Sequence, residues 1–340
     1  MVNYLASASF CVTAFLGGCS REVGQRSPAP THHARVVFAG DILLDEVPGK
    51  LIASGTDPFV PTAPWLSRAD LTVGNLESPI AETGTVVPKV YQFRAHPRTL
   101  PTLAAHFGLV SLANNHSGDY GREALLETMR GLDSVGVPFT GAGNNLAEAH
   151  EPKILERQGL RIAILGYSEY QPRGFEAGHA TPGVAWSEEE QVVADIHRAQ
   201  QLGAQLVIPF LHWGWENEAL PCQRQRDLAR RLIDAGAAAV VGAHPHVTQG
   251  AEIYRGRPII YSLGNFVFSL IDEERNAAGW LLRLDLDELG IARWDTVVVI
   301  IDERGVPSPK TSILSPCGLR GDLHPRDCSV QVDRVAADQL

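Results

Sequence analysis

The 340-residue sequence lacks clusters of lysine and arginine, and its formal net charge is −10. These two properties exclude the basic surface by which proteins bind nucleic acids or anionic membranes. The sequence also has no uninterrupted apolar run of about 20 residues, so we predict no transmembrane helix. It contains no internal repeat. With 44% hydrophobic and 20% charged residues, the composition predicts a globular protein.

Cysteine is scarce: the chain contains only Cys11, Cys19, Cys222, Cys317 and Cys328. These residues lack the paired spacing of a metal site. The last two lie eleven residues apart in a segment, residues 306–340, that is typical of a loop-like C-terminal tail. In an oxidising compartment these two cysteines can form a local disulfide. Two free surface thiols are the alternative.

The first 19 residues predict an export signal, because residues 4–18 are uncharged and mostly apolar or small. The run that ends at Cys19 resembles a bacterial lipobox, in which cleavage leaves the cysteine as the lipid-modified first residue. The absence of Lys or Arg before the apolar run departs from the usual signal peptide. We expect export, with either a lipid anchor at Cys19 or plain secretion. Residues 20–34 are rich in Pro, Ser, His and Arg and predict a linker.

Short apolar runs repeatedly end in polar side chains of the kinds that bind metals. Residues 35–39 predict a buried strand that delivers Asp41 at its end. Four later runs, at 71–74, 109–112, 206–211 and 238–241, end in the same way, followed by Asn75 and Glu77, by Asn114, Asn115 and His116, by His212, and by His244 and His246.

Helical patterns lie between these runs, at residues 121–135, 187–202 and 223–235. Ser187, with Glu190 three residues later, predicts a capping box at the second helix. The alternation of strands and helices predicts an α/β fold with functional groups at strand C-termini. Apolar runs with little helix follow residue 250 and predict a second sheet or its completion: 251–254, 258–262, 280–287 and 291–301.

Each of these polar residues alone fits a turn or a cap. Together they provide carboxylate oxygens, amide oxygens and neutral imidazole nitrogens, which is the donor set that a pair of divalent cations requires. His244 and His246 flank Pro245. Both histidines can face one crevice if the backbone turns between them.

A series of ordered motifs over residues 35–268 resembles the capsule-synthesis CapA family, which is associated with poly-γ-glutamate: Gly40-Asp41, Asn75-Leu76-Glu77, Phe93-Arg94-Ala95, Asn114-Asn115-His116 with Asp119, His212-Trp213-Gly214 with Glu216, His244-Pro245-His246, and Gly264-Asn265-Phe266. The resemblance implies a calcineurin-like metallophosphatase fold over residues 35–305. This is an α/β sandwich of two mixed β-sheets flanked by helices.

The resemblance also implies two divalent cations, such as Mn, Zn or Fe, with Glu77 as their shared carboxylate. The implied ligands are Asp41, Glu77, Asn115, His212, His244 and His246. His116 would protonate a leaving group or steady the transition state, and Asp119 would orient His116. Two departures weaken the transfer of phosphatase activity. Leu43 stands where metallophosphatases place a histidine, and the second motif ends in Glu77 in place of their Gly-Asp pattern.

Three further residues are candidates for substrate contacts, each with a structural alternative. Arg94 can grip an anion in a bidentate manner or form a structural salt bridge. Glu216 can contact substrate or a ligand, or cap a helix. Asn265 lies in a turn that we expect to pack under the histidine pair, and it is a weaker candidate. Trp213 and Trp215 can wall the cleft against water or belong to the core.

Three functions agree with this reading. The first is metal-dependent hydrolysis or transfer at an amide-linked anionic polymer such as poly-γ-glutamate. The second is a non-catalytic subunit of a membrane synthase and export complex, and the third is a metallophosphoesterase. His116 with Asp119 favours retained chemistry, whereas Leu43 argues against a complete two-metal centre.

Overall fold

The computed structural model describes residues 1–2, 30–170, 173–269 and 274–330. Cys19 and most of the predicted export signal and linker lie outside these residues. None of the helices within the described ranges is both long enough and apolar enough to cross a bilayer. At the end of the predicted linker, the backbone N–H of His32 donates to the Glu288 carboxylate at 2.9 Å, so the chain already contacts the domain there.

In the described part of the chain, a ten-stranded sheet forms one layer, in the order β18-β17-β15-β14-β1-β2-β3-β4, with β13 beside β1 and β16 beside β15. One half of this sheet is parallel and contains β1, β2, β3, β4 and β13. The other half, β14 to β18, is antiparallel, and β14 joins it to β1 in antiparallel fashion. The strands of this sheet are β1 Ala34–Ile42, β2 Leu71–Leu76, β3 Leu109–Ser111, β4 Phe139–Thr140, β13 Asn265–Val267, β14 Ala278–Asp287, β15 Gly290–Ile301, β16 Pro307–Pro309, β17 Ser315–Leu319 and β18 Arg326–Cys328.

A six-stranded sheet in the order β11-β12-β10-β9-β7-β6 forms the second layer of the described chain, and β5 pairs with β8 separately. These strands are β6 Lys153–Arg157, β7 Leu160–Ser168, β9 Leu206–His212, β10 Val240–Ala243, β11 Ala251–Tyr254, β12 Arg257–Ile260, β5 Ala142–Gly143 and β8 Gly183–Val184.

Side chains that alternate along β1 explain why the sheets stack. Val36 and Phe38 point into a core shared with the second sheet, and Phe38 meets Phe210 of β9 edge to face at 5.5 Å. Val37 and Ala39 point to the opposite face of the sheet, into a core shared with helices. The two-residue period of a strand buried on both faces therefore produces a sandwich with helices outside.

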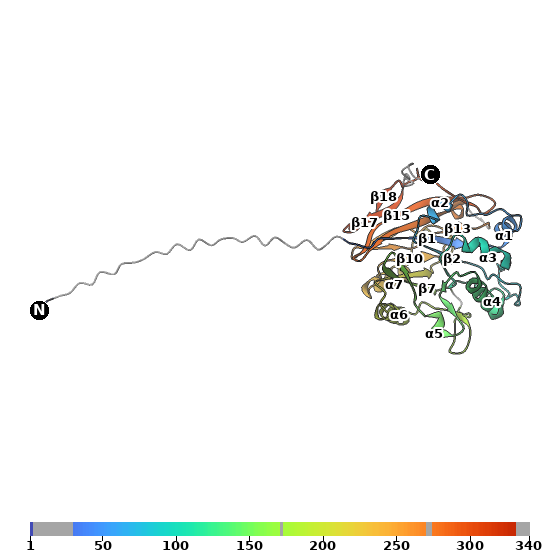
Figure 1. Ribbon diagram of the computed structural model, residues 1–340, viewed down its shortest axis with the longest axis horizontal. Coiled ribbons are helices and arrows are strands. Elements are labelled where there is room, and N and C mark those ends of the chain that lie inside the picture. Colours follow the sequence, from blue (N-terminus) through green and yellow to red (C-terminus); the bar gives the residue numbers. More distant parts are fainter. Residues whose placement is uncertain (3–29, 171–172, 270–273, 331–340) are drawn as a thin grey trace.

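Helices cover the outer faces of both sheets (Figure 1). Those against the large sheet are α1 Glu46–Ala53, α2 Ala63–Leu66, α3 Leu100–Ala104 and α4 Gly121–Ser134, and those against the small sheet are α6 Glu189–Gln201 and α7 Gln223–Asp234. Short elements complete the set: α5 Leu146–Ala149 and the 3₁₀ turns η1 Pro97–Thr99 and η2 Glu274–Ala277. The predicted α/β sandwich is confirmed, and each predicted helix agrees with α4, α6 or α7 within two residues at either end.

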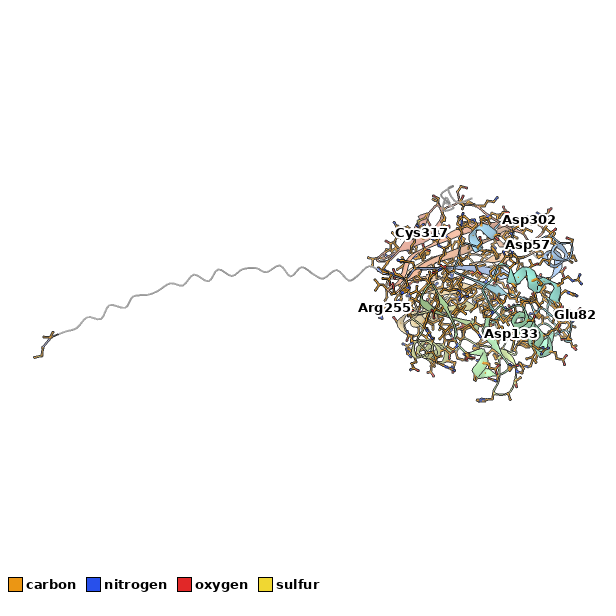
Figure 2. The ribbon with its side chains drawn as sticks, in the orientation of Figure 1. Asp57, Glu82, Asp133, Arg255, Asp302 and Cys317 are labelled. Carbon is orange, nitrogen blue, oxygen red and sulfur yellow. A yellow bond between two sulfur atoms is a disulfide. The ribbon has the colours of Figure 1, made fainter. Side chains whose placement is uncertain are left out.

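Two local predictions are wrong. Ser187 does not cap α6, because its hydroxyl donates to Glu169 and the N-cap position is Glu188. The predicted tail from residue 306 is also folded up to residue 328, where β16, β17 and β18 extend the large sheet. Cys317 and Cys328 form a disulfide with Cα atoms 5.9 Å apart, and Figure 2 places Cys317 at this edge of the domain.

Candidate metal centre

The register of the sheets brings the predicted ligands to one edge. Asp41 lies opposite Asn75 of β2 and opposite Asn265 of β13. In the second sheet, His212 ends β9 opposite Ala243, the residue before His244. Because these strands run parallel, their carboxyl ends meet at the same crevice between the two layers.

A turn at the end of β10 presents two histidines. The backbone φ is 97° at His244 and 57° at His246, the left-handed region that costs about 1–3 kcal/mol per non-glycine residue. The backbone N–H of His244 donates to Asp41 Oδ2 at 3.3 Å, which helps to hold this conformation. The turn that the sequence predicted around Pro245 is present, and it is strained in the way that functional sites often are.

The ligand atoms form overlapping groups whose members lie within 4.8 Å of one another. Glu77, His212 and His244 make up the first, which we call the imidazole group. Asp41, Glu77 and His246 make up the second, which we call the carboxylate group. Glu77 belongs to both, in the position predicted for a shared carboxylate.

Two asparagines contact the groups, and Asn75 connects them. The Asn75 side-chain amide donates to Asp41 Oδ1 at 2.8 Å and lies 3.1 Å from His212 Nδ1. The Asn115 amide oxygen lies 2.7 Å from His212 Nε2, so it faces the imidazole group as predicted. Asn114, by contrast, accepts from the backbone N–H of His116 and shapes the loop.

Charge and burial perturb the carboxylate group. Burial, followed by the charge of Asp41, raises the pKa of Glu77 well above its ordinary value. Burial opposes protonation of His246, but the Glu77 and Asp41 carboxylates outweigh it and raise the pKa of His246 to about 10. Without a cation this group therefore retains protons, which a bound metal would displace.

The imidazole group is perturbed in the opposite direction. Burial and the charge of His246 lower the pKa of His244 well below its ordinary value, and burial with neighbouring histidines does the same for His212. Both rings are consequently neutral near pH 7, which is the form that coordinates a metal.

Polar atoms without hydrogen bonds test whether these residues fit a cation. Within the described ranges, both carboxylate oxygens of Glu77 and the Nδ1 atom of His244 are buried and make no hydrogen bond. Buried polar atoms are almost always paired, so such atoms indicate an ion or water between them. Carboxylate and imidazole donors fit a divalent cation such as zinc, manganese or iron.

Leu43 is fully buried and packs with Phe93 and Phe268. The ring of Phe268 lies 5.0 Å from that of His246, so position 43 falls in the apolar layer beside the carboxylate group. This layer offers no ligand where metallophosphatases place a histidine, and the carboxylate group is the poorer of the two.

The predicted pair of His116 and Asp119 is present beside the ligand groups. His116 Nδ1 lies 2.7 Å from Asp119 Oδ2, and because an ionised carboxylate only accepts, the proton sits on Nδ1. Asp119 also accepts from the backbone N–H of Phe93 at 2.8 Å, which fixes its position. Burial lowers the pKa of His116, although Asp119 opposes that shift. The Nε2 atom remains for a substrate.

Two of the three substrate candidates bond to other parts of the protein, and of these Asn265 lies behind the histidine pair, as expected. The Arg94 guanidinium donates to the carbonyls of Glu82 and Thr83, each at 3.3 Å, and stacks over Tyr120 at 4.1 Å. Asn265 is buried, and its amide oxygen accepts from His246 Nδ1 at 2.9 Å, so it lies behind the ligand shell.

The other side chains of this region divide between ligand, core and surface. The Glu216 carboxylate is exposed and forms a third ligand group with His244 and His246. Trp213 is core and donates its indole N–H to the Tyr261 carbonyl at 2.9 Å, whereas Trp215 is 62% exposed.

Lys89 is a site residue that sequence reasoning missed. Its ammonium group donates to the Asn115 carbonyl at 2.8 Å and forms an ion pair with Asp119. The residue lies in a loop between β2 and α3, and no strand, helix or motif around it signals a function. The preceding residue, Pro88, likewise gives no indication of a functional site.

Comparisons with known proteins identify the family of the chain. The family model described as bacterial capsule synthesis protein PGA_cap matches residues 35–270. The PGA biosynthesis protein CapA of Bacillus subtilis (strain 168) is 32% identical over 278 residues, covering 80% of this chain and 72% of that protein. The capsule biosynthesis protein CapA of Bacillus anthracis is 31% identical over 301 residues, covering 84% and 73%.

Among solved structures, a 5'-nucleotidase precursor from Thermus thermophilus aligns with a TM-score of 0.50 and 13% identity. The alignment covers 81% of this chain and 56% of that one, and at this identity it shows the fold alone. The predicted metallophosphatase-like fold is confirmed. Because the family model matches more than half of the chain, the protein belongs to the bacterial capsule synthesis protein PGA_cap family.

Proposed function

We propose that the chain is a divalent-metal-dependent hydrolase or transferase that acts on an amide-linked anionic polymer in capsule or poly-γ-glutamate synthesis. Family membership and the names of the two Bacillus relatives support a role in that pathway. The observation that carries the enzymatic part is the buried Glu77 carboxylate, which belongs to both ligand groups and has no hydrogen-bond partner in the described chain.

The residues that would hold the cations are Asp41, Glu77, Asn115, His212, His244 and His246. A divalent cation bound there supplies Lewis acidity, which acidifies water and polarises a carbonyl or phosphoryl oxygen. In the proposed hydrolysis, water adds to the γ-carbonyl carbon and the C–N bond breaks. In the Nδ1–H tautomer that Asp119 holds, His116 Nε2 takes the proton that the attacking water loses and passes it to the departing nitrogen.

We also propose that the protein works at the cell envelope, exported through its N-terminal segment and anchored by lipid at Cys19. Membrane synthase subunits are the expected partners, and the membrane contact is limited to that anchor. Both proposals depend on residues outside the described ranges and on the pathway of the relatives.

One observation favours a second candidate function. The apolar contact of Leu43 with Phe93 and Phe268 leaves the carboxylate group without a further ligand. A chain that binds a single ion weakly would serve as a non-catalytic synthase subunit. The third possibility is a metallophosphoesterase, which would use the same candidate metal centre on a different substrate.

Elemental analysis of the purified protein, together with turnover assays, separates these functions. We expect bound transition metal and cleavage of γ-glutamyl oligomers. His116→Ala should lower turnover by roughly 10²- to 10⁴-fold, which is the usual contribution of a general acid, without loss of metal. Cleavage of a chromogenic phosphodiester but not of γ-glutamyl oligomers would favour the phosphoesterase. An absence of metal after incubation with manganese or zinc would favour the non-catalytic subunit.

A further inference from the structure

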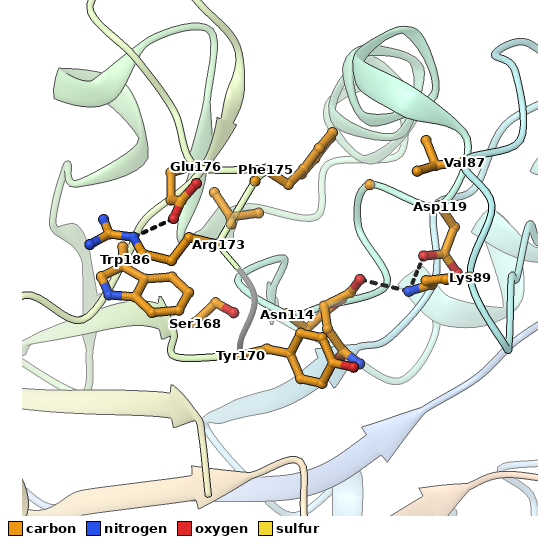
Figure 3. Close-up of a pocket in the computed structure, with 14 residues that line it drawn as sticks. Val87, Lys89, Asn114, Asp119, Ser168, Tyr170, Arg173, Phe175, Glu176 and Trp186 are labelled. Atoms are coloured by element: carbon orange, nitrogen blue, oxygen red, sulfur yellow. Dashed lines mark hydrogen bonds and ion pairs between the residues drawn. The ribbon is translucent and has the colours of Figure 1, made fainter. Parts of the chain in front are cut away.

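A pocket of about 340 Å³ opens beside the candidate metal centre (Figure 3). Its volume lies within the range of small-ligand sites, roughly 300–1,000 Å³. The wall is mostly apolar, and the residues that matter for recognition are Lys89, Asn115, Asp119, Tyr170, Phe175 and Trp186.

The pocket and the metal centre share side chains, so a ligand in one reaches the other. Asn115, which faces the imidazole group, and Asp119, the partner of His116, both line the pocket. Tyr170 also lines it, and its ring meets the His244 ring edge to face at 5.4 Å. The pocket is therefore a side chamber of the centre.

Lys89 gives this chamber a cation with a donor to spare. Its ammonium group has three N–H donors, of which the Asn115 carbonyl accepts one, and the Asp119 carboxylate, its ion-pair partner, occupies a second. The nearby Nδ1 atom of His116, at 3.1 Å, cannot accept the third, because its own proton is donated to Asp119. Figure 3 shows Lys89 at the pocket wall with its contact to Asp119.

The opposite wall is aromatic and firmly held. The Phe175 ring packs on the Gly118 backbone so closely that a Cβ atom there would lie 2.6 Å from it. Arg173 covers the Trp186 ring at 4.5 Å and is itself paired with Glu176 and Glu188, so its charge is already matched. The wall therefore offers flat apolar surface. Lys89 is also ion-paired, with Asp119, but its third N–H donor remains for an acidic ligand.

We propose that this pocket is a subsite for one γ-linked glutamyl unit of the polymer, next to the amide bond that reacts. The α-carboxylate of the unit accepts from Lys89, and its two methylene groups pack against Tyr170, Phe175 and Trp186. This ligand has one anion and a short apolar stem, which is the combination that the two walls recognise. The assignment rests on the proposed function.

Equilibrium binding of a γ-glutamyl trimer to the full-length, metal-loaded protein, measured by calorimetry, tests the subsite. Lys89→Met should weaken binding roughly ten- to a hundredfold, the range for a lost charge-assisted hydrogen bond. Lys89→Arg should restore part of it. Trp186→Ala should weaken binding about tenfold, and this variant leaves the Asp119 ion pair untouched.

Matched controls are available on the surface. Lys50→Met, at a side chain that is 77% exposed on α1, and Trp215→Ala, at an exposed tryptophan outside the pocket, should both bind like the wild type. Thermal unfolding of every variant identifies any that fails to fold, and Trp186→Ala then carries the test if Lys89→Met is such a variant.

Equal binding by all variants, or no binding of the trimer by the wild type, overturns the subsite. Inorganic phosphate that binds in a Lys89-dependent way while the trimer does not bind overturns the ligand class. Trimer binding that depends on Lys89 and Trp186 in a protein without turnover supports the subsite and rejects the hydrolase. Turnover with binding that ignores both residues supports the hydrolase and rejects the subsite.

Discussion

The two ligand groups of the candidate metal centre share Glu77 but differ in their other ligands and in the residues that pack against them. The imidazole group combines two neutral histidines with the amide oxygen of Asn115. The carboxylate group has one histidine and Asp41, and it lies against the apolar layer that contains Leu43. The same edge of the fold therefore provides one candidate cation position with many donor atoms and one with fewer.

This difference indicates how a metallophosphatase-like fold can change its chemistry with few substitutions. A cation prefers the position that offers more donors without competing apolar contacts. We expect the imidazole group to bind the tighter ion and the carboxylate group to bind the weaker one. Variants that alter one group at a time test this ranking of the two positions.

Glu77→Gln should have the largest effect, because it removes the carboxylate that both groups share. We expect loss of both ions and of turnover. The metal-free protein should become less stable by about 1–3 kcal/mol, since the carboxylate that supports the charge of His246 is replaced by an amide that is buried without a hydrogen-bond partner.

Metal analysis and urea unfolding without metal measure the two effects of Glu77→Gln. Glu82→Gln, at a carboxylate that is 67% exposed, is the matched control. Full metal content in the Glu77 variant would contradict the shared-ligand assignment.

His244→Ala should remove the tighter ion, because the variant deletes one of the two imidazoles of its group. His197→Ala, at an exposed position on α6, should retain the full metal content. Elemental analysis after dialysis distinguishes them. If His244→Ala released only the weaker ion, the ranking of the two groups would have to be reversed.

Leu43→His should strengthen the weaker position by supplying the missing ligand. We expect at least about tenfold tighter binding of the second ion, since even outer-shell contacts change metal affinity by roughly 10–100-fold. The metal-free protein should lose about 1–3 kcal/mol, because an imidazole replaces leucine against Phe93 and Phe268. Leu43→Ile is the control without a ligand atom. Calorimetric titration with manganese compares the three proteins, and unchanged binding would show that position 43 cannot reach the ion.

The sequence predicted the parts of this centre that depend on local patterns. Asp41, His212 and His244 each follow a short apolar run, and parallel strands bring such ends together. Strand β7 was not predicted, because the run from Leu160 ends in Ser168 and carries no carboxylate, amide or imidazole of the kind that marked the predicted strands. Its last residue, Ser168, lines the pocket beside the metal centre.

Other features could not be predicted because they depend on contacts distant in sequence. β17 begins at Ser315 and is only five residues long, and its partner in the sheet is β15. Lys89 lies in a loop and forms an ion pair with Asp119, and the conformation of such a loop depends on the packing of the whole domain. Asn265 was expected under the histidine pair, but its hydrogen bond to His246 required the register of β13 and β1.

Asn265→Ala should weaken only the carboxylate group. Its amide oxygen orients His246, and outer-shell partners of this kind usually contribute 10–100-fold to metal affinity. We expect about that loss for the weaker ion and no change for the tighter one, measured by competition with a chelator. Asn265→Asp keeps the acceptor and should retain the ion. Loss of the tighter ion in Asn265→Ala would mean that the two groups do not act separately.

Arg94→Met should have the smallest effect of the series, because the guanidinium contacts backbone carbonyls and the Tyr120 ring and no ligand group. We expect a stability loss below about 1 kcal/mol, the usual contribution of an exposed cation–π contact. The KM for γ-glutamyl oligomers should change less than about twofold, whereas a lost charged hydrogen bond in Lys89→Met should raise it roughly tenfold. Steady-state kinetics on both variants decides between the two cations. A large rise in KM for Arg94→Met alone would restore the bidentate anion contact that the sequence suggested and would place the polymer at Arg94 instead of at the pocket.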